Sequence, residues 1–261
     1  MKTITIANQK GGVGKTTTAQ TFACGLALKG YKVLAIDCDS QGNMSFTFNQ
    51  LNKEKTIFEV LQQENIFDCI THTEQKVDLI PASDKLFLAD TLFNQSNDIY
   101  RLKVQLQKLN EVYDFCIIDT PPSLNLITKN CFIASDSVII PMHTDLFSMQ
   151  GLSQLLKTIE EARKKQKEQG LQELSIDGIL LTEYNNRTIL NRTLSHQIEK
   201  ISKQTGLNVF NSTIRSGILV REAQNNQSNI FKENPRANVT KDYENFIKEY
   251  LKKYYKKETK K

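Results

Sequence analysis

Apolar positions along the chain fall into short unbroken runs that are separated by longer stretches with helical spacing. The runs at 33–36, 115–118 and 138–140 are rich in β-branched and aromatic residues. Continuous runs of this kind are typical of parallel strands that are buried on both faces. We therefore predict strands over 3–8, 32–37, 77–81, 115–119, 137–141 and 176–182, with a weaker strand over 207–211.

The stretches between these runs have the three- and four-residue apolar spacing of helices. This spacing predicts helices over 16–29, 99–109, 124–134, 152–169, 189–204 and 239–255. Alternating strands and helices predict a doubly wound α/β fold with a mostly parallel sheet flanked by helices. We find no repeat and no Pro/Gly/Ser linker, so the 261 residues are expected to form one domain that ends in a short basic tail. The polar, Asn-rich segment 224–234 is expected to be a surface loop.

A glycine-rich segment, K-G-G-V-G-K-T-T at 10–17, lies between the first predicted strand and the first predicted helix. Glycines allow the backbone to curl so that successive N–H groups point at phosphate oxygens, and the helix N-terminus adds its positive dipole end. The Lys15 ammonium can reach the β- and γ-phosphates, and the Thr16 hydroxyl can bind Mg²⁺. The residues predicted to bind a nucleotide here are Gly11, Gly12, Val13, Gly14, Lys15, Thr16 and Thr17.

Acidic residues follow two of the buried strands, where ligands bind in open α/β sheets. Asp37 and Asp39 end the second predicted strand, and Asp119 ends the run at 115–118. An aspartate at a strand end is also a common turn former. The phosphate loop upstream favours a magnesium site, because Mg²⁺ prefers oxygen ligands and keeps several waters.

The loop departs from the usual phosphate-loop pattern, since Gln9 occupies the first glycine position and Lys10 follows it. This form resembles the deviant Walker A family, which includes the ParA/Soj partition ATPases, the MinD division-site ATPases and the nitrogenase iron protein. The resemblance implies an ATPase that uses ATP and Mg²⁺ and forms a homodimer, with Lys10 reaching the nucleotide of the partner subunit. A second cation near the γ-phosphate would stabilise charge in the transition state.

The segments around the carboxylates carry the same resemblance. The sequence I-D-C-D-S-Q-G-N at 36–43 is similar to the first switch of the partition family, which implies that Asp39 positions the attacking water and that Asp37 supports the Mg²⁺ shell. Ser40 stands where that family usually has proline. The segment 115–123 resembles a Walker B strand with the second switch, which implies that Asp119 holds Mg²⁺ through water.

The resemblance to the partition family covers nearly the whole chain. The segments 145–152 and 180–187 are similar to the stretch after the fifth strand and to the strand end that receives adenine. Asn185 is therefore a candidate adenine contact, although an asparagine in a turn is an equally good interpretation. The segment R-E-A-Q-N at 221–225 keeps only Glu-Ala of the family's S-E-A-P-S stretch.

Basic residues in the C-terminal half are the candidates for contact with DNA. In Soj-like proteins such residues form a face that binds double-stranded DNA without sequence preference, and the net charge of +5 permits this. A lone surface arginine is also often only solvated. The residues to which the resemblance assigns this role are Arg187, Arg192, Arg215 and Arg221.

Three other function classes compete with partition. A MinD-like ATPase would attach to a membrane through a basic amphipathic C-terminal helix, and residues 239–255 have one apolar and one lysine-rich face. A metabolic enzyme, such as an amide-forming ligase, would need a further acid/base constellation that the sequence does not contain. A nitrogenase-type reductase would need paired cluster cysteines, whereas the five cysteines are scattered and are expected to be buried, reduced thiols.

These observations and the resemblance together predict a partition ATPase that is slow alone, and the resemblance implies a ParB-like partner that stimulates it. We expect it to be cytoplasmic and associated with the nucleoid, since no secretory signal and no apolar run of membrane-spanning length is present.

Overall fold

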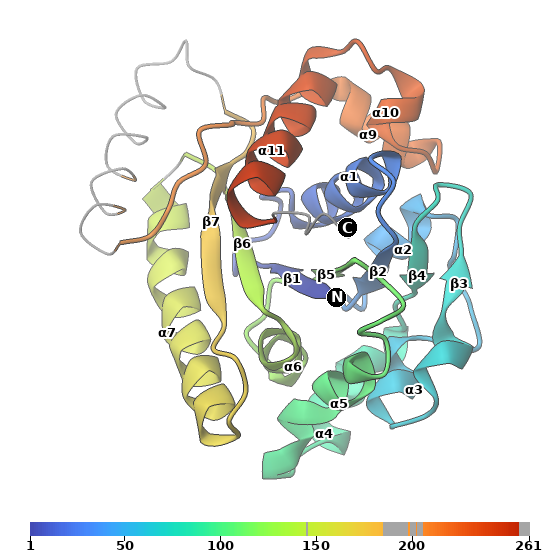
Figure 1. Ribbon diagram of the computed structural model, residues 1–261, viewed down its shortest axis with the longest axis vertical. Helices are drawn as coiled ribbons and strands as arrows, with labels where there is room; N and C mark the ends of the chain where they lie inside the picture. The colour runs from blue at the N-terminus through green and yellow to red at the C-terminus, as the bar shows by residue number, and fades with distance from the viewer. Residues whose placement is uncertain (145, 185–197, 199–201, 203–205, 256–261) are drawn as a thin grey trace, which may run out of the picture.

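The protein is a three-layer α/β structure with a seven-stranded sheet at its centre (Figure 1). The computed structural model describes residues 1–144, 146–184, 198, 202 and 206–255. The strand order is β3-β4-β2-β5-β1-β6-β7, and every neighbouring pair is parallel except β3 with β4. The strands are β1 (Lys2–Ile6), β2 (Val33–Asp37), β3 (Thr71–His72), β4 (Asp78–Ile80), β5 (Phe115–Asp119), β6 (Ser137–Met142) and β7 (Ser175–Leu181).

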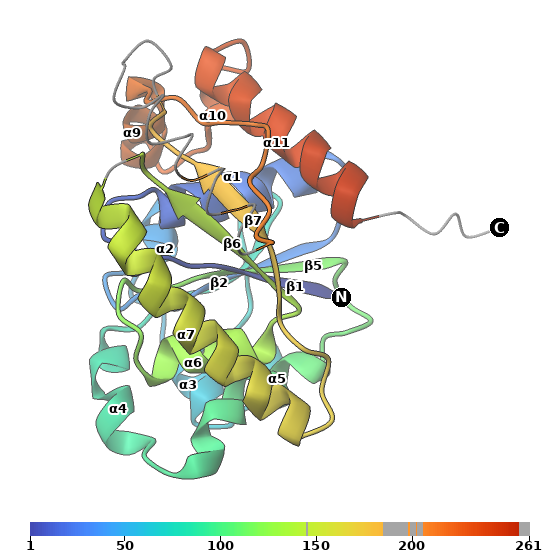
Figure 2. The same ribbon diagram turned by 90° about the vertical axis from the view of Figure 1, so that its left-hand side faces the viewer.

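Helices cover both faces of this sheet (Figure 2). The α-helices are α1 (Lys15–Leu28), α2 (Asn43–Thr47), α3 (Ile57–Leu61), α4 (Ala89–Leu92), α5 (Arg101–Gln107), α6 (Leu126–Ala134), α7 (Leu146–Glu168), α9 (Ile218–Asn225), α10 (Ile230–Glu233) and α11 (Asn238–Tyr254). The described residues also form the 3₁₀ helices η1 (Ile66–Cys69), η2 (Asp84–Leu88) and η3 (Ser96–Tyr100). No helix in the described ranges is long and apolar enough to cross a membrane.

Alternate residues of each central strand point to opposite faces, and both sets are buried. Ile4 and Ile117 face α1 and α11, whereas Ile118 belongs to the cluster under α3, α5 and α6. Burial on both faces explains why these strands have continuous apolar runs in the sequence. All five cysteines are buried and free, as expected from their apolar surroundings.

The C-terminal helix α11 lies across α1 and closes one face of the sheet (Figures 1 and 2). Its apolar stripe is buried, and the ring of Phe246 packs 5.4 Å from that of Phe22 and 5.0 Å from that of Phe210. The hydroxyl of Tyr250 donates a 2.8 Å hydrogen bond to Asp177 in β7. The apolar face of this helix is therefore part of the protein core.

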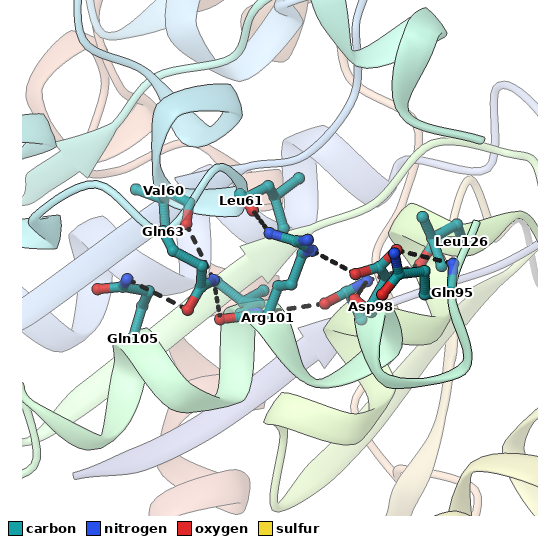
Figure 3. Close-up of polar contacts among 10 residues, drawn as sticks. Val60, Leu61, Gln63, Gln95, Asp98, Arg101, Gln105 and Leu126 are labelled. Carbon is teal, nitrogen blue, oxygen red and sulfur yellow. Dashed lines mark hydrogen bonds and ion pairs between the residues drawn. The ribbon is translucent and has the colours of Figure 1, made fainter. Parts of the chain in front are cut away.

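A polar network ties α6 to α3 and α5 on the other face (Figure 3). The guanidinium of Arg101 donates to the carboxylate of Asp98 at 2.7 Å and to the carbonyl of Leu61 at 3.0 Å. The carboxamide of Asn130 in α6 donates to the carbonyls of Asp98 and Leu126 at 2.9 and 3.2 Å. Helix α6 begins at Leu126, shortly after the segment 115–123 that contains Asp119, so this network helps to position the C-terminal end of that segment.

Six predicted strands are confirmed, and the structure corrects three expectations. The segment 207–211 forms only an isolated bridge between Val209 and Ile179 and is not a strand. The expected loop at 224–234 contains the end of α9 and the short helix α10, because Asn229 caps α10 and Ile230 is buried. Helix α7 begins at Leu146, earlier than the predicted 152. The helix predicted over 189–204 lies largely outside the described residues.

Candidate functional site

The glycine-rich loop joins the C-terminal end of β1 to the first turn of α1. Gly12 has φ 74° and Gly14 has φ 79°, a left-handed backbone that residues with a Cβ rarely adopt. Gly14 is also the N-cap of α1, which has no side-chain cap. The first N–H groups of this helix therefore have no side-chain cap, and an uncapped helix start after a glycine loop is suited to binding an anion.

Two side chains outside the motif hold the loop in place. Asn8 accepts a 3.0 Å hydrogen bond from the N–H of Lys10 and donates a 2.7 Å bond to the carbonyl of Pro141 in β6. The hydroxyl of Thr182, after β7, donates a 2.9 Å bond to the carbonyl of Val13. Neither residue was predicted to support the loop, although a polar residue at the end of the strand predicted over 3–8 was a signal for Asn8.

The loop opens into a cavity of about 620 Å³ at the C-terminal edge of the sheet. The loop residues that line it are Gly11, Gly12, Gly14, Lys15, Thr16 and Thr17. Asp39 and Gln41 contribute from the segment after β2, and Val220, Arg221 and Gln224 contribute from α9. The cavity therefore brings together the predicted phosphate loop, the predicted first switch and helix α9, which the sequence analysis did not predict.

Lys15 is the first residue of α1 and is buried, and its Nζ donates a 3.0 Å hydrogen bond to the carbonyl of Lys10. Burial lowers the pKa of Lys15, and the nearby carboxylates of Asp119 and Asp39 partly counter this effect. An ammonium held by a backbone carbonyl in this way can turn toward a phosphate without leaving the cavity.

Asp119 and Asp37 lie side by side at the ends of adjacent strands, paired in the register of β5 and β2. Asp119 is fully buried, and neither of its carboxylate oxygens has a hydrogen-bond partner with ordinary geometry. Burial and the neighbouring charge of Asp37 raise the pKa of Asp119 well above its usual value, whereas the nearby Thr16 hydroxyl and Lys15 oppose the rise. A buried carboxylate whose oxygens lack a hydrogen bond of ordinary geometry is costly unless a cation neutralises it, and the nearby Lys15 supplies part of this neutralisation in the free protein.

Asp37 differs from Asp119 because its oxygens are satisfied. It accepts 2.7 Å bonds from both the N–H and the hydroxyl of Ser45 in α2, and a 3.2 Å bond from the N–H of Asp39. Burial raises its pKa to about 6, and the bonds from Ser45 limit the rise. Asp37 therefore anchors α2 in this structure, and its predicted support of a metal shell stays a prediction.

The donor set of Asp119 and Thr16 fits Mg²⁺. The described residues contain no group of three or more His, Cys, Asp or Glu side chains that could hold a metal ion together. One carboxylate and one hydroxyl, completed by waters and phosphate oxygens, is the kind of shell that Mg²⁺ takes in phosphate-binding sites. The unpaired oxygens of Asp119 are the observation that supports this fit.

The remaining predicted residues are only partly tested by the geometry. Arg215 and Arg221 line the cavity, and the guanidinium of Arg215 forms a two-pronged ion pair with Asp242 of α11 at 2.6 and 2.9 Å. The predicted adenine contact and two of the predicted DNA contacts lie outside the described residues, namely Asn185, Arg187 and Arg192. Lys10 lies in the loop, and its reach into a partner subunit stays a prediction.

A strand, a glycine loop and a helix start, with carboxylates at the next strand ends, define a P-loop nucleotide-binding protein of the α/β class. The family model described as the AAA domain matches residues 1–173. The sporulation initiation inhibitor protein Soj of Bacillus subtilis is 35% identical over 253 residues, which is 95% of this chain and 97% of Soj. This chain belongs to the ParA/Soj family of P-loop partition ATPases.

Solved structures agree on the fold. A plasmid partition protein from Borrelia burgdorferi superposes with a TM-score of 0.75 at 29% identity, covering 97% of this chain and 98% of its own. Cobyrinic acid a,c-diamide synthase from Mycobacterium smegmatis, with bound ADP and magnesium, superposes with a TM-score of 0.81 at 26% identity, covering 97% and 96%. The fold is therefore shared by partition proteins and by an amide-forming enzyme.

Proposed function

We propose that this protein is a DNA partition ATPase that binds Mg-ATP, dimerises in that state, binds DNA without sequence preference and is reset by hydrolysis. The observation that carries the proposal is the cavity that the phosphate loop and Asp39 line together, with the buried carboxylate of Asp119 at the adjacent strand end, in a chain 35% identical to Soj over nearly its full length. A ParB-like activator is the partner that the resemblance implies. The whole chain acts as one domain in this scheme, in the cytoplasm and on the nucleoid.

The loop residues would bind the triphosphate. The N–H groups of residues 11–15 and the start of α1 supply fixed partial positive charge, and the Lys15 ammonium supplies a full charge on the β- and γ-phosphates. Mg²⁺, when bound through Thr16 and Asp119, supplies charge neutralisation at the phosphate oxygens. These groups are positioned before the substrate arrives, so they need little reorganisation during the reaction.

Asp39 is the residue that we assign to the attacking water. Asp39 lines the cavity and is 8% exposed, and its carboxylate accepts a 3.1 Å bond from the N–H of Gln41. A carboxylate in this place can orient a water by accepting its hydrogen bond, with Lys10 of a second subunit stabilising the transferred charge. Hydrolysis by orientation alone is slow, which fits a reaction that waits for an activating partner.

The structure favours partition over membrane attachment through the C-terminal helix. Membrane binding would need a free apolar face on α11, but Tyr243, Phe246 and Tyr250 of that face are at most 1% exposed. The diamide synthase shares the fold at 26% identity, and the 35% identity with Soj favours partition over amide formation.

The test is steady-state phosphate release together with the molar mass in solution, with ATP or ADP, DNA and a ParB-like protein. We expect a dimer with ATP and a monomer with ADP, and a slow basal rate that rises when both DNA and the activator are present. Fast turnover without either addition, or one molar mass in both nucleotide states, would contradict the proposal.

A further inference from the structure

The turn of the β3–β4 hairpin contacts α1, α2 and the α9–α10 loop, which adjoin the nucleotide cavity. In Figure 1 the turn between β3 and β4 lies beside the loop that joins α9 to α10. The turn is fixed locally, because the hydroxyl of Thr73 donates a 2.7 Å bond to the carbonyl of Val77 and accepts a 3.3 Å bond from the N–H of Gln75. Lys76 completes the turn with φ 62°. The hairpin therefore presents one side chain, Gln75, in a defined direction.

The amide group of Gln75 joins two segments that are far apart in sequence. Its Nε2 donates a 2.7 Å hydrogen bond to the carbonyl of Thr47, the last residue of α2. The same nitrogen donates a 3.2 Å bond to the carbonyl of Gln227, in the loop after α9. Both donors of the amide are therefore used, one on each segment.

The carbonyl oxygen of Gln75 adds two further elements. It accepts a 3.3 Å bond from Nδ2 of Asn229, the cap of α10, and a 3.3 Å contact from the thiol of Cys24 in α1. Gln20 of α1 approaches the same oxygen at 3.4 Å and donates a 2.9 Å bond to the carbonyl of Ser228. One carboxamide thus connects α1, α2 and the α9–α10 loop.

Each of these elements also contributes to the nucleotide cavity. Helix α1 begins at Lys15, and α2 follows directly after the segment that contains Asp39. Helix α9 lines the cavity, and the carboxamide of Gln224 in it donates a 3.1 Å bond to the hydroxyl of Thr17. Helices α1 and α9 are therefore joined at the cavity through Thr17, and Gln75 joins α1, α2 and the α9–α10 loop at a second place.

We infer that Gln75 is a positioning residue that couples helix α2 to helix α9, so that the Asp39 segment and the α9 wall of the cavity change position together. This inference rests on the proposed ATPase function. Helix α2 is held at Ser45 by Asp37 and at Thr47 by Gln75, and only the second contact also holds the α9–α10 loop. Without Gln75, α2 keeps its hydrogen bonds to β2 and its apolar packing in the core cluster shared with α9, but loses its hydrogen-bonded link to the α9–α10 loop.

The variants Gln75→Leu and Gln75→Asn test this inference. Leucine keeps much of the volume without any hydrogen bond, and asparagine stays polar but is one methylene too short to reach both carbonyls. The matched control is Glu74→Gln, which changes an exposed neighbour in the same turn for which the structure records no side-chain contact. The asparagine variant keeps the test valid if the leucine variant does not fold.

The readouts are ATPase kinetics, calorimetric binding of a non-hydrolysable ATP analogue and of ADP, and amide hydrogen exchange in both states. We expect kcat to fall about tenfold with KM changed by less than about twofold, as two neutral hydrogen bonds would allow. In the wild type and in Glu74→Gln, exchange at 43–48 and at 226–230 should differ between the two nucleotide states in parallel. In the Gln75 variants only the 43–48 segment should still respond.

The outcomes separate this inference from the proposed function. A wild-type protein that binds neither nucleotide would refute the proposed function itself. Normal nucleotide binding by the Gln75 variants, with kcat and both exchange responses unchanged, would overturn the coupling role alone. A lower melting temperature with the same parallel response would show that Gln75 only packs the hairpin, and it would overturn the inference as well.

Discussion

Replacing Asp119 by asparagine should stabilise the protein without ligand and abolish its stabilisation by Mg-nucleotide. The carboxylate of Asp119 is fully buried, has no hydrogen-bond partner with ordinary geometry, and lies beside the buried Asp37. Asparagine has nearly the same shape but no charge. The substitution therefore removes an electrostatic penalty of the free protein together with the charge that a magnesium ion would need.

The size of the expected change in the free energy of unfolding follows from the burial of the Asp119 carboxylate. A buried polar group without a partner costs about 1–3 kcal/mol, and a charged one costs more. The new amide keeps part of this cost, so we expect the free energy of unfolding to rise by about 1–2 kcal/mol. In a protein of this size that corresponds to a melting temperature higher by roughly 2–8 °C.

The assay is thermal unfolding in EDTA and again with Mg²⁺ and ADP. A ligand at 100 times its Kd stabilises the wild type by about 2.7 kcal/mol, and this increment should be lost in Asp119→Asn. The matched control is Asp37→Asn, whose carboxylate accepts bonds from Ser45 and Asp39, and which should be less stable than the wild type in EDTA. An Asp119→Asn protein less stable than the wild type in EDTA would refute the reasoning.

The raised pKa values of Asp119 and Asp37 determine the direction of a pH effect on stability. The pKa of Asp119 in the folded protein is raised above its unfolded value, and that of Asp37 is raised to about 6. Between the unfolded and folded pKa values the folded state binds more protons, so these groups reduce stability as pH rises through this window. The advantage of Asp119→Asn in EDTA should therefore shrink as the pH is lowered from 7 to about 5. An advantage that stays constant over this window would contradict the assignment.

Two further predictions concern the core and the loop. Phe246→Ala should cost about 3–5 kcal/mol in chemical denaturation, because this ring of α11 is fully buried against Phe22 and Phe210; a loss below about 1 kcal/mol would mean that α11 is not part of the core. The Lys15→Ala variant should fold normally yet show no melting-temperature increase with ADP, because the Lys15 ammonium that it lacks is predicted to bind the phosphates. A full increase would show that Lys15 does not contribute to nucleotide binding.

Much of the fold could be predicted because its strongest signals are local. The central strands are buried on both faces, so their apolar runs stand out, and the phosphate loop is specified by adjacent residues. Helix α3 also had a local signal that was missed, since Thr56 and Glu59 form a capping box at its start. The two-residue strand β3 gave no such signal, because it exists only through its pairing with β4.

The candidate site was predictable in its chemistry but not in its supports. The positions of Asp37 and Asp119 at strand ends were clear from sequence, but their different roles depend on Ser45, which reaches only one of them. Thr182 and Gln75 act through contacts with residues 169 and 28 positions away in the chain. Contacts of this length depend on the assembled sheet and have no signature in a single sequence.

The most direct test of the account is co-sedimentation of an Asp39→Ala variant with DNA of mixed sequence, in ATP and in ADP, at low and moderate salt. The variant should bind ATP but not hydrolyse it, which holds the protein in its ATP state. We expect DNA binding with ATP only, without sequence preference, that weakens as salt rises, because contacts to phosphates release counterions. An absence of DNA binding in both nucleotide states, in a variant that binds ATP, would contradict the account.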